Sequence, residues 1–305
     1  MCLRVARSNR LSEQFLRDTG ETLTDPRWAV AWKFQALEAS TRLEDVTFSV
    51  GRTGHVVPLA VLEQVEIGGV MVQRATLHYA GMLTRLDFRK GDLVVLQRAG
   101  DVIPQVVGIV DGLRGEEVHS ISIPTHCPSC GSLLERRSSE IKSKVDDSLP
   151  FPDEGRNEEH DDSGDHVPML LFCPNTSLCP AQSINRLEHF ARVCFEGIGP
   201  GVVGKLEECK LVSDISDFYS LKLEDLRELD GLGDLSAANI LNAVDDSKHI
   251  SLDVALFGFG IPHVGQVAAK LLHEYGRDIN RIREMDVEAL LEIKVTTYSY
   301  AQHVC

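Results

Sequence analysis

Apolar and polar residues alternate over several short stretches in the first third of this 305-residue chain. Such alternation, interrupted by glycine-containing turns, is typical of β-strands with one buried face. Between residues 41 and 110 it predicts the strands Asp45–Val50, Val56–Leu62, Val65–Val72 and Asp92–Arg98. About five short strands in this length favour a small all-β OB-type barrel, a fold that commonly binds nucleic acid.

The pattern changes after Gln182, where apolar residues recur with the period of an α-helix. This helical region opens with Ile184, Leu187, Phe190 and Ala191. The sequence therefore predicts a second domain that is all α-helical.

Within the helical region a hydrophobic-Gly-hydrophobic-Gly pattern recurs, each time followed by a helix. Two copies are clear and a third is looser: Phe195–Gly199, Leu229–Gly233 and Phe259–Gly265. This is the helix-hairpin-helix pattern, whose glycines let backbone amides approach a phosphate at a helix N-terminus. A lone Gly-x-Gly would indicate only a turn, but the repetition favours DNA binding. The candidate contacts are the glycines Gly197, Gly199, Gly231, Gly233, Gly260 and Gly265.

Two cysteine pairs lie between the two patterned regions. Cys127 with Cys130 and Cys173 with Cys179 provide four thiols grouped two by two, which is the ligand set of a closed tetrahedral Zn2+ site. The alternative is a set of buried or unpaired thiols. The 42 residues between the pairs include an acidic stretch with few aromatics, residues 139–168, which predicts a disordered loop inserted into a zinc knuckle.

The composition favours a modular protein of two or three small cores, because 43% of its residues are hydrophobic. No apolar run approaches the roughly 20 residues that a membrane span needs, so no membrane partner is expected. The arginine-rich start could be an organellar presequence, but Glu13, Asp18 and Glu21 interrupt it. Cysteine use favours a reducing compartment inside the cell, which is the cytoplasm, the nucleus or an organelle, and not secretion.

The formal net charge of −15 would at first exclude a nucleic-acid partner. Its distribution removes that objection. Residues 139–168 hold ten Asp/Glu and three Lys/Arg, or −7, whereas residues 1–110 hold twelve Asp/Glu and thirteen Lys/Arg, or +1. Net charge therefore does not decide the partner.

Several strings, taken with the order of barrel, cysteines and hairpins, resemble the C-terminal part of the bacterial-type NAD-dependent DNA ligases. They are Trp28–Phe34, Val50–Gly54, Arg74–His78, Arg98–Pro104, Cys173–Gln182, Ser236–Ile240 and His263–Gly265. The resemblance covers about Leu3 to Ile293. It implies four domains: residues 1–40 as a remnant of the nucleotidyltransferase (adenylation) domain, 41–120 as the OB fold, 121–183 as the zinc finger with its insert, and 184–305 as the helix-hairpin-helix domain.

The resemblance also implies roles for single residues. Lys33 corresponds to the lysine that contacts the nucleotide phosphate during adenylate transfer, where a fixed ammonium stabilises charge on the transferring group. Arg4 takes the place of a second phosphate-binding lysine, with a different geometry. The four cysteines would be zinc ligands that hold the barrel to the hairpin domain. The OB-domain candidates for contact with the DNA backbone or the nucleotide are Arg52, Arg74, His78 and Arg98.

The chain also departs from the family. It contains no Lys-x-Asp-Gly motif, so the family's nucleophilic lysine is expected to be missing and no enzyme-adenylate is expected to form. The family's NAD-recognition domain is also expected to be missing. NAD+ and Mg2+ would serve the complete family enzyme and not this chain alone. A fourth hairpin is expected to be missing or altered, because Lys294–Tyr298 contains no Gly-x-Gly.

Two functions remain open at this point. The first is part of an NAD-dependent DNA ligase, which seals nicks between a 3'-hydroxyl and a 5'-phosphate in replication and repair. The second is a non-catalytic, zinc-containing module that binds duplex DNA. Nicked duplex DNA is the expected partner in both, and a separate polypeptide could carry the adenylation domain. A truncated gene product, with ends set by gene modelling, is a further alternative.

Overall fold

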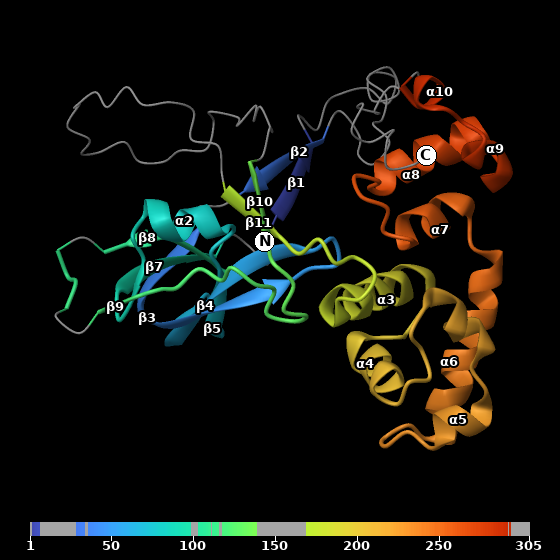
Figure 1. Ribbon diagram of the computed structural model, residues 1–305, viewed down its shortest axis with the longest axis horizontal. Helices are drawn as coiled ribbons and strands as arrows, with labels where there is room; N and C mark the ends of the chain where they lie inside the picture. Colours follow the sequence, from blue (N-terminus) through green and yellow to red (C-terminus); the bar gives the residue numbers. More distant parts are fainter. Residues whose placement is uncertain are drawn as a thin grey trace. The chain divides into compact units, whose positions relative to one another are not determined.

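A computed structural model describes residues 2–6, 29–33, 36–98, 103–110, 112–115, 118–138, 169–291 and 293. The described residues form two compact units (Figure 1): a barrel unit within residues 33–175 and a helical unit within residues 176–305. Strands β1 (Cys2–Ala6) and β2 (Ala29–Lys33) form a two-stranded sheet. The predicted disorder of residues 139–168 and the altered chain after Ile293 lie outside the described residues.

Five strands close the barrel. They are β3 (Leu37–Val50), β4 (His55–Ile67), β5 (Val70–Thr76), β7 (Leu93–Arg98) and β8 (Gln105–Ile109). Their order around the barrel is β3-β4-β5-β8-β7 and back to β3, and every pair is antiparallel except β5 with β8. Helix α2 (Ala80–Arg85) follows β5, and β6 (Arg89–Lys90) pairs with β9 (His119–Ser120). This is the OB topology, as the alternating pattern predicted.

The barrel closes because alternate side chains of each strand are apolar and point inward. In β4, every second residue from Val56 to Leu62 is buried, while the residues between them are partly exposed. Val94 and Leu96 of β7 are completely buried in the same core. Removing this apolar surface from water stabilises the closed sheet.

One strand prediction was wrong. Val65–Val72 is not a single strand, because Gly68 and Gly69 turn the chain so that Ile67 pairs with Val70. Both glycines have positive φ, +60° and +77°, which is the backbone of a two-residue hairpin turn and which glycine adopts without steric cost. The apolar residues on both sides of this turn hid it in the sequence.

Two further strands flank the acidic segment. Strand β10 (Glu135–Ser138) pairs antiparallel with β11 (Met169–Phe172), and Ser138 lies opposite Met169. Strand β11 also pairs with β4, where Leu171 lies opposite Val56. Ser138 and Met169, which flank the acidic segment, therefore lie side by side at the end of this β-ribbon.

The helical unit consists of short helices. They are α3 (Pro180–Cys194), α4 (Pro200–Glu208), η1 (Ile215–Ser220), α5 (Leu223–Arg227), α6 (Asp234–Asp246), η2 (Ser247–His249), α7 (Leu252–Gly258), α8 (Gln266–Gly276), α9 (Ile279–Arg283) and α10 (Val287–Leu291). None of the described helices is long and apolar enough to cross a membrane.

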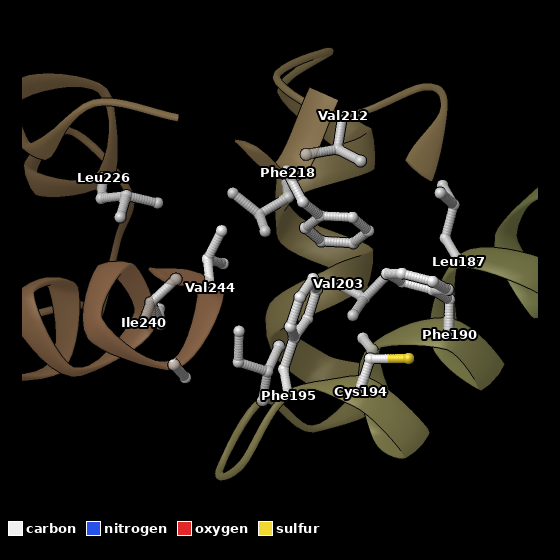
Figure 2. Close-up of a cluster of buried hydrophobic side chains, with 14 of the residues drawn as sticks. Leu187, Phe190, Cys194, Phe195, Val203, Val212, Phe218, Leu226, Ile240 and Val244 are labelled. Atoms are coloured by element: carbon white, nitrogen blue, oxygen red, sulfur yellow. The ribbon is translucent and has the colours of Figure 1, made fainter. Parts of the chain in front are cut away.

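Two apolar cores hold these helices together. In the larger one, Phe190, Phe195 and Phe218 meet side chains from α4 and α6 (Figure 2). The rings of Phe195 and Phe218 pack edge to face, with centroids 5.1 Å apart, an arrangement that aromatic quadrupoles favour. A second core joins α7 to α10 around Leu272 and Leu290.

Candidate metal centre and nucleic-acid interface

The structure brings the four predicted cysteines together. The sulfur atoms of Cys127, Cys130, Cys173 and Cys179 all lie within 4.8 Å of one another. Three of the four side chains, those of Cys127, Cys173 and Cys179, are buried. The two cysteine pairs, which 42 residues separate in the sequence, therefore form a single cluster in space.

A tight turn, backbone hydrogen bonds and a helix N-terminus position these cysteines. Gly131 has a φ of +73°, and its amide donates to the carbonyl of Cys127 at 2.9 Å, so the chain turns tightly between the first two cysteines. The amide of Cys173 donates to the carbonyl of Gly54 in the β3–β4 turn at 2.8 Å. Cys179 is the N-cap residue of α3, where the helix N-terminus favours a negatively charged group.

The pKa values of three thiols in the cluster are shifted, and not in the same direction. Burial raises the pKa of the Cys127 thiol and raises the pKa of Cys173 to about 12. Hydrogen bonding to Ser132, first through its side chain and then its backbone, lowers the pKa of Cys130 to about 6. Burial therefore opposes ionisation of two of the thiols, and a cation is needed to hold all four as thiolates.

The donor set fits zinc. Tetrahedral coordination with a Zn–S distance of about 2.3 Å places sulfur atoms about 3.8 Å apart. The Cys130 and Cys173 sulfurs are 3.5 Å apart, and no pair exceeds 4.8 Å. Four cysteines leave no open coordination position, so a metal here would be structural.

The three predicted hairpins share one backbone form. Helices α4, α6 and α8 each begin after an extended glycine, which is Gly199, Gly233 or Gly265, with φ between −80° and −91°. No side chain caps any of these three N-termini. The first amides of a helix have no partner within it, so these ends can offer amides to an anion.

The third hairpin differs in one residue. Gly197 and Gly231, two residues before the N-cap glycines, have φ of +80° and +79°, and His263 holds the equivalent position with a φ of +66°. Gly260 also has a positive φ, but it lies just after α7. In the third hairpin the structure therefore places His263, and not Gly260, where the other two hairpins have their first glycine.

The OB-domain candidates do not form one cluster. Arg52 is half-buried in the β3–β4 turn, at the start of β4. Arg98 ends β7 near the opposite end of β4, where its Nη1 donates to the carbonyl of Ile67 at 3.4 Å. Arg74 is exposed on β5 opposite Val61. The three arginines are therefore spread along the length of β4, and one compact ligand could not contact all of them.

The remaining candidates are His78 of the OB domain and the two residues predicted to contact the nucleotide phosphate, Lys33 and Arg4. His78 follows β5, is exposed and has a φ of +58°, a conformation that is uncommon for a residue with a side chain. Lys33 ends β2 and Arg4 lies in β1. The side chains of these last two residues lie outside the described structure.

Sequence reasoning missed several polar groups that matter in the fold. Asp92 is fully buried and pairs with Arg114, whose Nε is 2.9 Å from its Oδ1. His189, also buried, lies 2.9 Å from the carbonyl oxygen of Phe257 through its Nε2. Lys205 of α4 donates to the carbonyl of Asp230 at 2.6 Å. Each joins residues far apart in sequence, so no local motif announces it.

Comparisons with known proteins agree with this arrangement. Residues 40–118 match the NAD-dependent DNA ligase OB-fold domain, and residues 254–304 match the helix-hairpin-helix motif. A protein of Bacteroides fragilis named DNA ligase is 36% identical over 295 residues, which are 95% of this chain and 39% of that protein. DNA ligase of Chloroflexus aggregans is 42% identical over 84% of this chain and 34% of its own length. DNA ligase of Aquifex aeolicus is 36% identical over 93% of this chain and 36% of its own length.

An OB-fold domain of the ligase type, followed by a helix-hairpin-helix region, is the class that the fold and these matches define. Within this class, the chain is related to the C-terminal part of the NAD-dependent DNA ligases. The resemblance read from the sequence motifs is thereby confirmed. The chain spans between 34% and 39% of the length of the three relatives named above.

Proposed function

We propose that these residues are the DNA-holding part of an NAD-dependent DNA ligase, an enzyme that joins a 3'-hydroxyl to a 5'-phosphate at a nick in duplex DNA. The observation that carries the proposal is the ligase-type OB domain at residues 40–118, joined in one chain to helix-hairpin-helix elements. Both element types bind nucleic acid through backbone contacts.

The division of labour follows from the residues present. Lys33 and Arg4 are proposed to contact the nucleotide phosphate, and Arg52, Arg74, His78 and Arg98 to lie along the DNA backbone or the nucleotide. The glycine hairpins are proposed to hold DNA phosphates through amides. NAD+ and a divalent metal ion belong to the family's chemistry, in which the nucleotide is first transferred to a lysine nucleophile.

We further propose that Zn2+ occupies the four-cysteine site as a structural ion. Cys127, Cys130, Cys173 and Cys179 would hold it as thiolates, in a zinc knuckle with no open position. The ion supplies positive charge that offsets the burial of the thiolates, and the chain contributes a fixed geometry around it. No bond-making step is assigned to it.

The chain by itself is proposed to be inactive in adenylation, because no Lys-x-Asp-Gly occurs in its 305 residues. Incubation of the purified chain with NAD+ labelled in its adenylate is expected to leave no label on the protein. A labelled band after denaturing electrophoresis would contradict this. Adding a polypeptide that carries the adenylation domain tests whether a partner in trans supplies the nucleophile.

The same missing motif favours a second candidate function, a zinc-containing DNA-binding module without catalysis. Both functions require that the chain bind nicked duplex, with an affinity that falls as salt rises because phosphate contacts release counterions. Binding without salt dependence would contradict both. Ligation restored by an adenylation polypeptide would distinguish the first from the second.

A further inference from the structure

The three hairpins share a backbone form but differ in charge. Residues 228–234 of the second hairpin contain three acidic residues and no basic one: Glu228, Asp230 and Asp234. Residues 195–201 of the first contain only Glu196, and residues 259–266 of the third contain no charged Asp, Glu, Lys or Arg. Because a phosphate chain is repelled by carboxylates, the three hairpins are not equivalent as DNA-binding elements.

Side chains of the protein already contact the second hairpin, although none of them caps the amides of α6. The Lys205 ammonium donates a hydrogen bond to the carbonyl oxygen of Asp230. The same ammonium is so close to Gly231 that a Cβ atom on this glycine would lie 3.3 Å from the Lys205 Nζ. Arg227 pairs with Asp234 at 2.8 Å. Asp234 also lies in the first turn of α6, where its carboxylate receives the favourable field of the helix N-terminus that a phosphate would otherwise receive.

The third hairpin has the opposite surroundings. Helix α8 has no acidic residue in its first turn. A cavity of about 640 Å³ beside it is lined by Gln266 and Lys270 of α8, by Arg192 of α3 and by Asp253 of α7. Neither Arg192 nor Lys270 forms an ion pair with another residue in the described part of the chain. Two cations and one carboxylate therefore lie next to uncapped amides.

We propose that the third hairpin, with Lys270 and Arg192 beside it, makes the main contact of the helical unit with the DNA sugar-phosphate backbone. Of the three hairpins proposed above to hold phosphates, the second instead acts as a brace, because Lys205 ties it to α4, the helix of the first hairpin. Lys205 is thus a positioning residue and does not touch DNA. This inference rests on the proposed DNA-binding function, and it names which part of the helical unit performs it.

Salt dependence separates a lysine that meets a phosphate from one that does not. Each phosphate neutralised contributes about 0.9 to the slope of log affinity against log salt. The full chain and three variants, Lys270→Gln, Lys205→Gln and Asp234→Asn, are titrated with a nicked duplex between low and high salt. All three side chains are exposed, so circular dichroism should show intact helices in each variant.

In Lys270→Gln, the plot of log affinity against log salt is expected to be less steep by about 0.9. Relative to any change in affinity at 1 M salt, binding at 0.1 M salt is then about eightfold weaker than in the wild type. Lys205→Gln is expected to keep the wild-type slope, with any loss of affinity the same at every salt concentration. Asp234→Asn is expected to change neither affinity nor slope.

An unchanged slope for Lys270→Gln would overturn the assignment of the third hairpin. A lower slope for Lys205→Gln, or tighter binding by Asp234→Asn, would show that the second hairpin meets DNA and would overturn its role as a brace. Failure of the wild-type chain to bind nicked duplex is a different result, because it would remove the proposed function itself.

Discussion

Gly258 and Gly204 both belong to helices of the helical unit, Gly258 as the last residue of α7 and Gly204 within α4, but their surroundings differ. A Cβ atom at Gly258 of α7 would clash with the sulfur of Cys194 and lie 3.4 Å from the ring of Phe190, whereas one at Gly204 of α4 would have no neighbour within 4 Å. The first glycine is needed because α3 and α7 pack closely there. The second has no packing reason, so helix propensity alone should govern its replacement.

Gly258→Ala is therefore expected to destabilise the helical unit by about 1 to 3 kcal/mol through overpacking, although alanine is the better helix former. Gly204→Ala, the matched control, is expected to stabilise it by roughly 0.5 to 1 kcal/mol. Urea unfolding followed by circular dichroism measures both. A stabilised Gly258→Ala would show that α3 and α7 do not meet as closely as described.

The contribution of a single cysteine to zinc binding can also be tested. Cys173→Ser is expected to lower the zinc content of the purified chain below one ion per molecule, because a hydroxyl is a poor zinc ligand. Cys209→Ser changes an exposed thiol outside the cluster and is expected to leave the zinc content unchanged. Elemental analysis decides the matter, and equal zinc in both variants would remove Cys173 from the ligand set.

Zinc affinity should also depend on pH. Burial raises the pKa of the Cys127 and Cys173 thiols above their ordinary value, and both must lose their protons to bind the ion. Protons therefore compete with zinc, and affinity is expected to fall as pH falls. Competition with a chromophoric chelator at several pH values measures this, and an affinity that rises towards low pH would contradict it.

The residue scale also shows what spacing can and cannot reveal. The cysteine quartet was predictable because each pair is local and zinc requires four ligands. The equivalence of His263 with Gly197 and Gly231 was not, because it is a property of φ and not of residue type. The pairing of Arg114 with buried Asp92 joins two loops and leaves no pattern in the sequence.

At the scale of elements, turn chemistry sets most boundaries. The sequence predicted parts of β3, β4 and β7 and the helices that follow the three hairpins, because apolar residues recur there with the period of a strand or a helix. It did not predict β8. It failed at Gly68–Gly69, where apolar residues continue through a turn. The start of η1 depends on a capping arrangement of two carboxylates. The Asp214 carboxylate accepts a hydrogen bond from the Ser216 amide, and the Asp217 carboxylate accepts one from the Asp214 amide.

This cap predicts a dependence on acid. Asp217 accepts hydrogen bonds from the Ser213 amide, the Asp214 amide and the Ser213 hydroxyl, and these bonds lower its pKa below 3.8. Because the folded pKa is depressed, the stabilisation is present above pH 3.8 and is lost as pH falls through the lower, folded value. Thermal unfolding at several acid pH values should show this loss in the wild type and a smaller one in Asp217→Asn. Equal pH profiles would contradict the role of Asp217 as a cap.

At the scale of the whole molecule, the β-ribbon explains how distant cysteines can share one site. Ser138 and Met169 are paired, so the chain leaves and returns at the same place. The entropy of closing a loop grows only slowly with its length. The number of residues between these two positions should therefore have little effect on the cluster at the other end of the ribbon.

Replacing residues 140–167 by a short glycine-rich turn is thus expected to preserve one zinc ion per chain and to stabilise the barrel by only about 1 to 2 kcal/mol, because a shorter loop loses less entropy on closure. A larger deletion, residues 135–172, removes both strands and serves as the contrasting variant, with loss of zinc expected. Zinc analysis and urea unfolding provide the comparison. Loss of zinc in the shorter deletion would mean that residues 140–167 support the site.

The register of β10 and β11 has a practical consequence. A position where the chain departs and returns between paired residues is a natural attachment point for a foreign domain, such as a fluorescent reporter whose own termini lie close together. Inserted between Ser138 and Met169, the reporter would leave the sequence of the barrel, the cysteines and the hairpins intact. The chain could then carry a tag between its paired strands β10 and β11 and away from both of its termini.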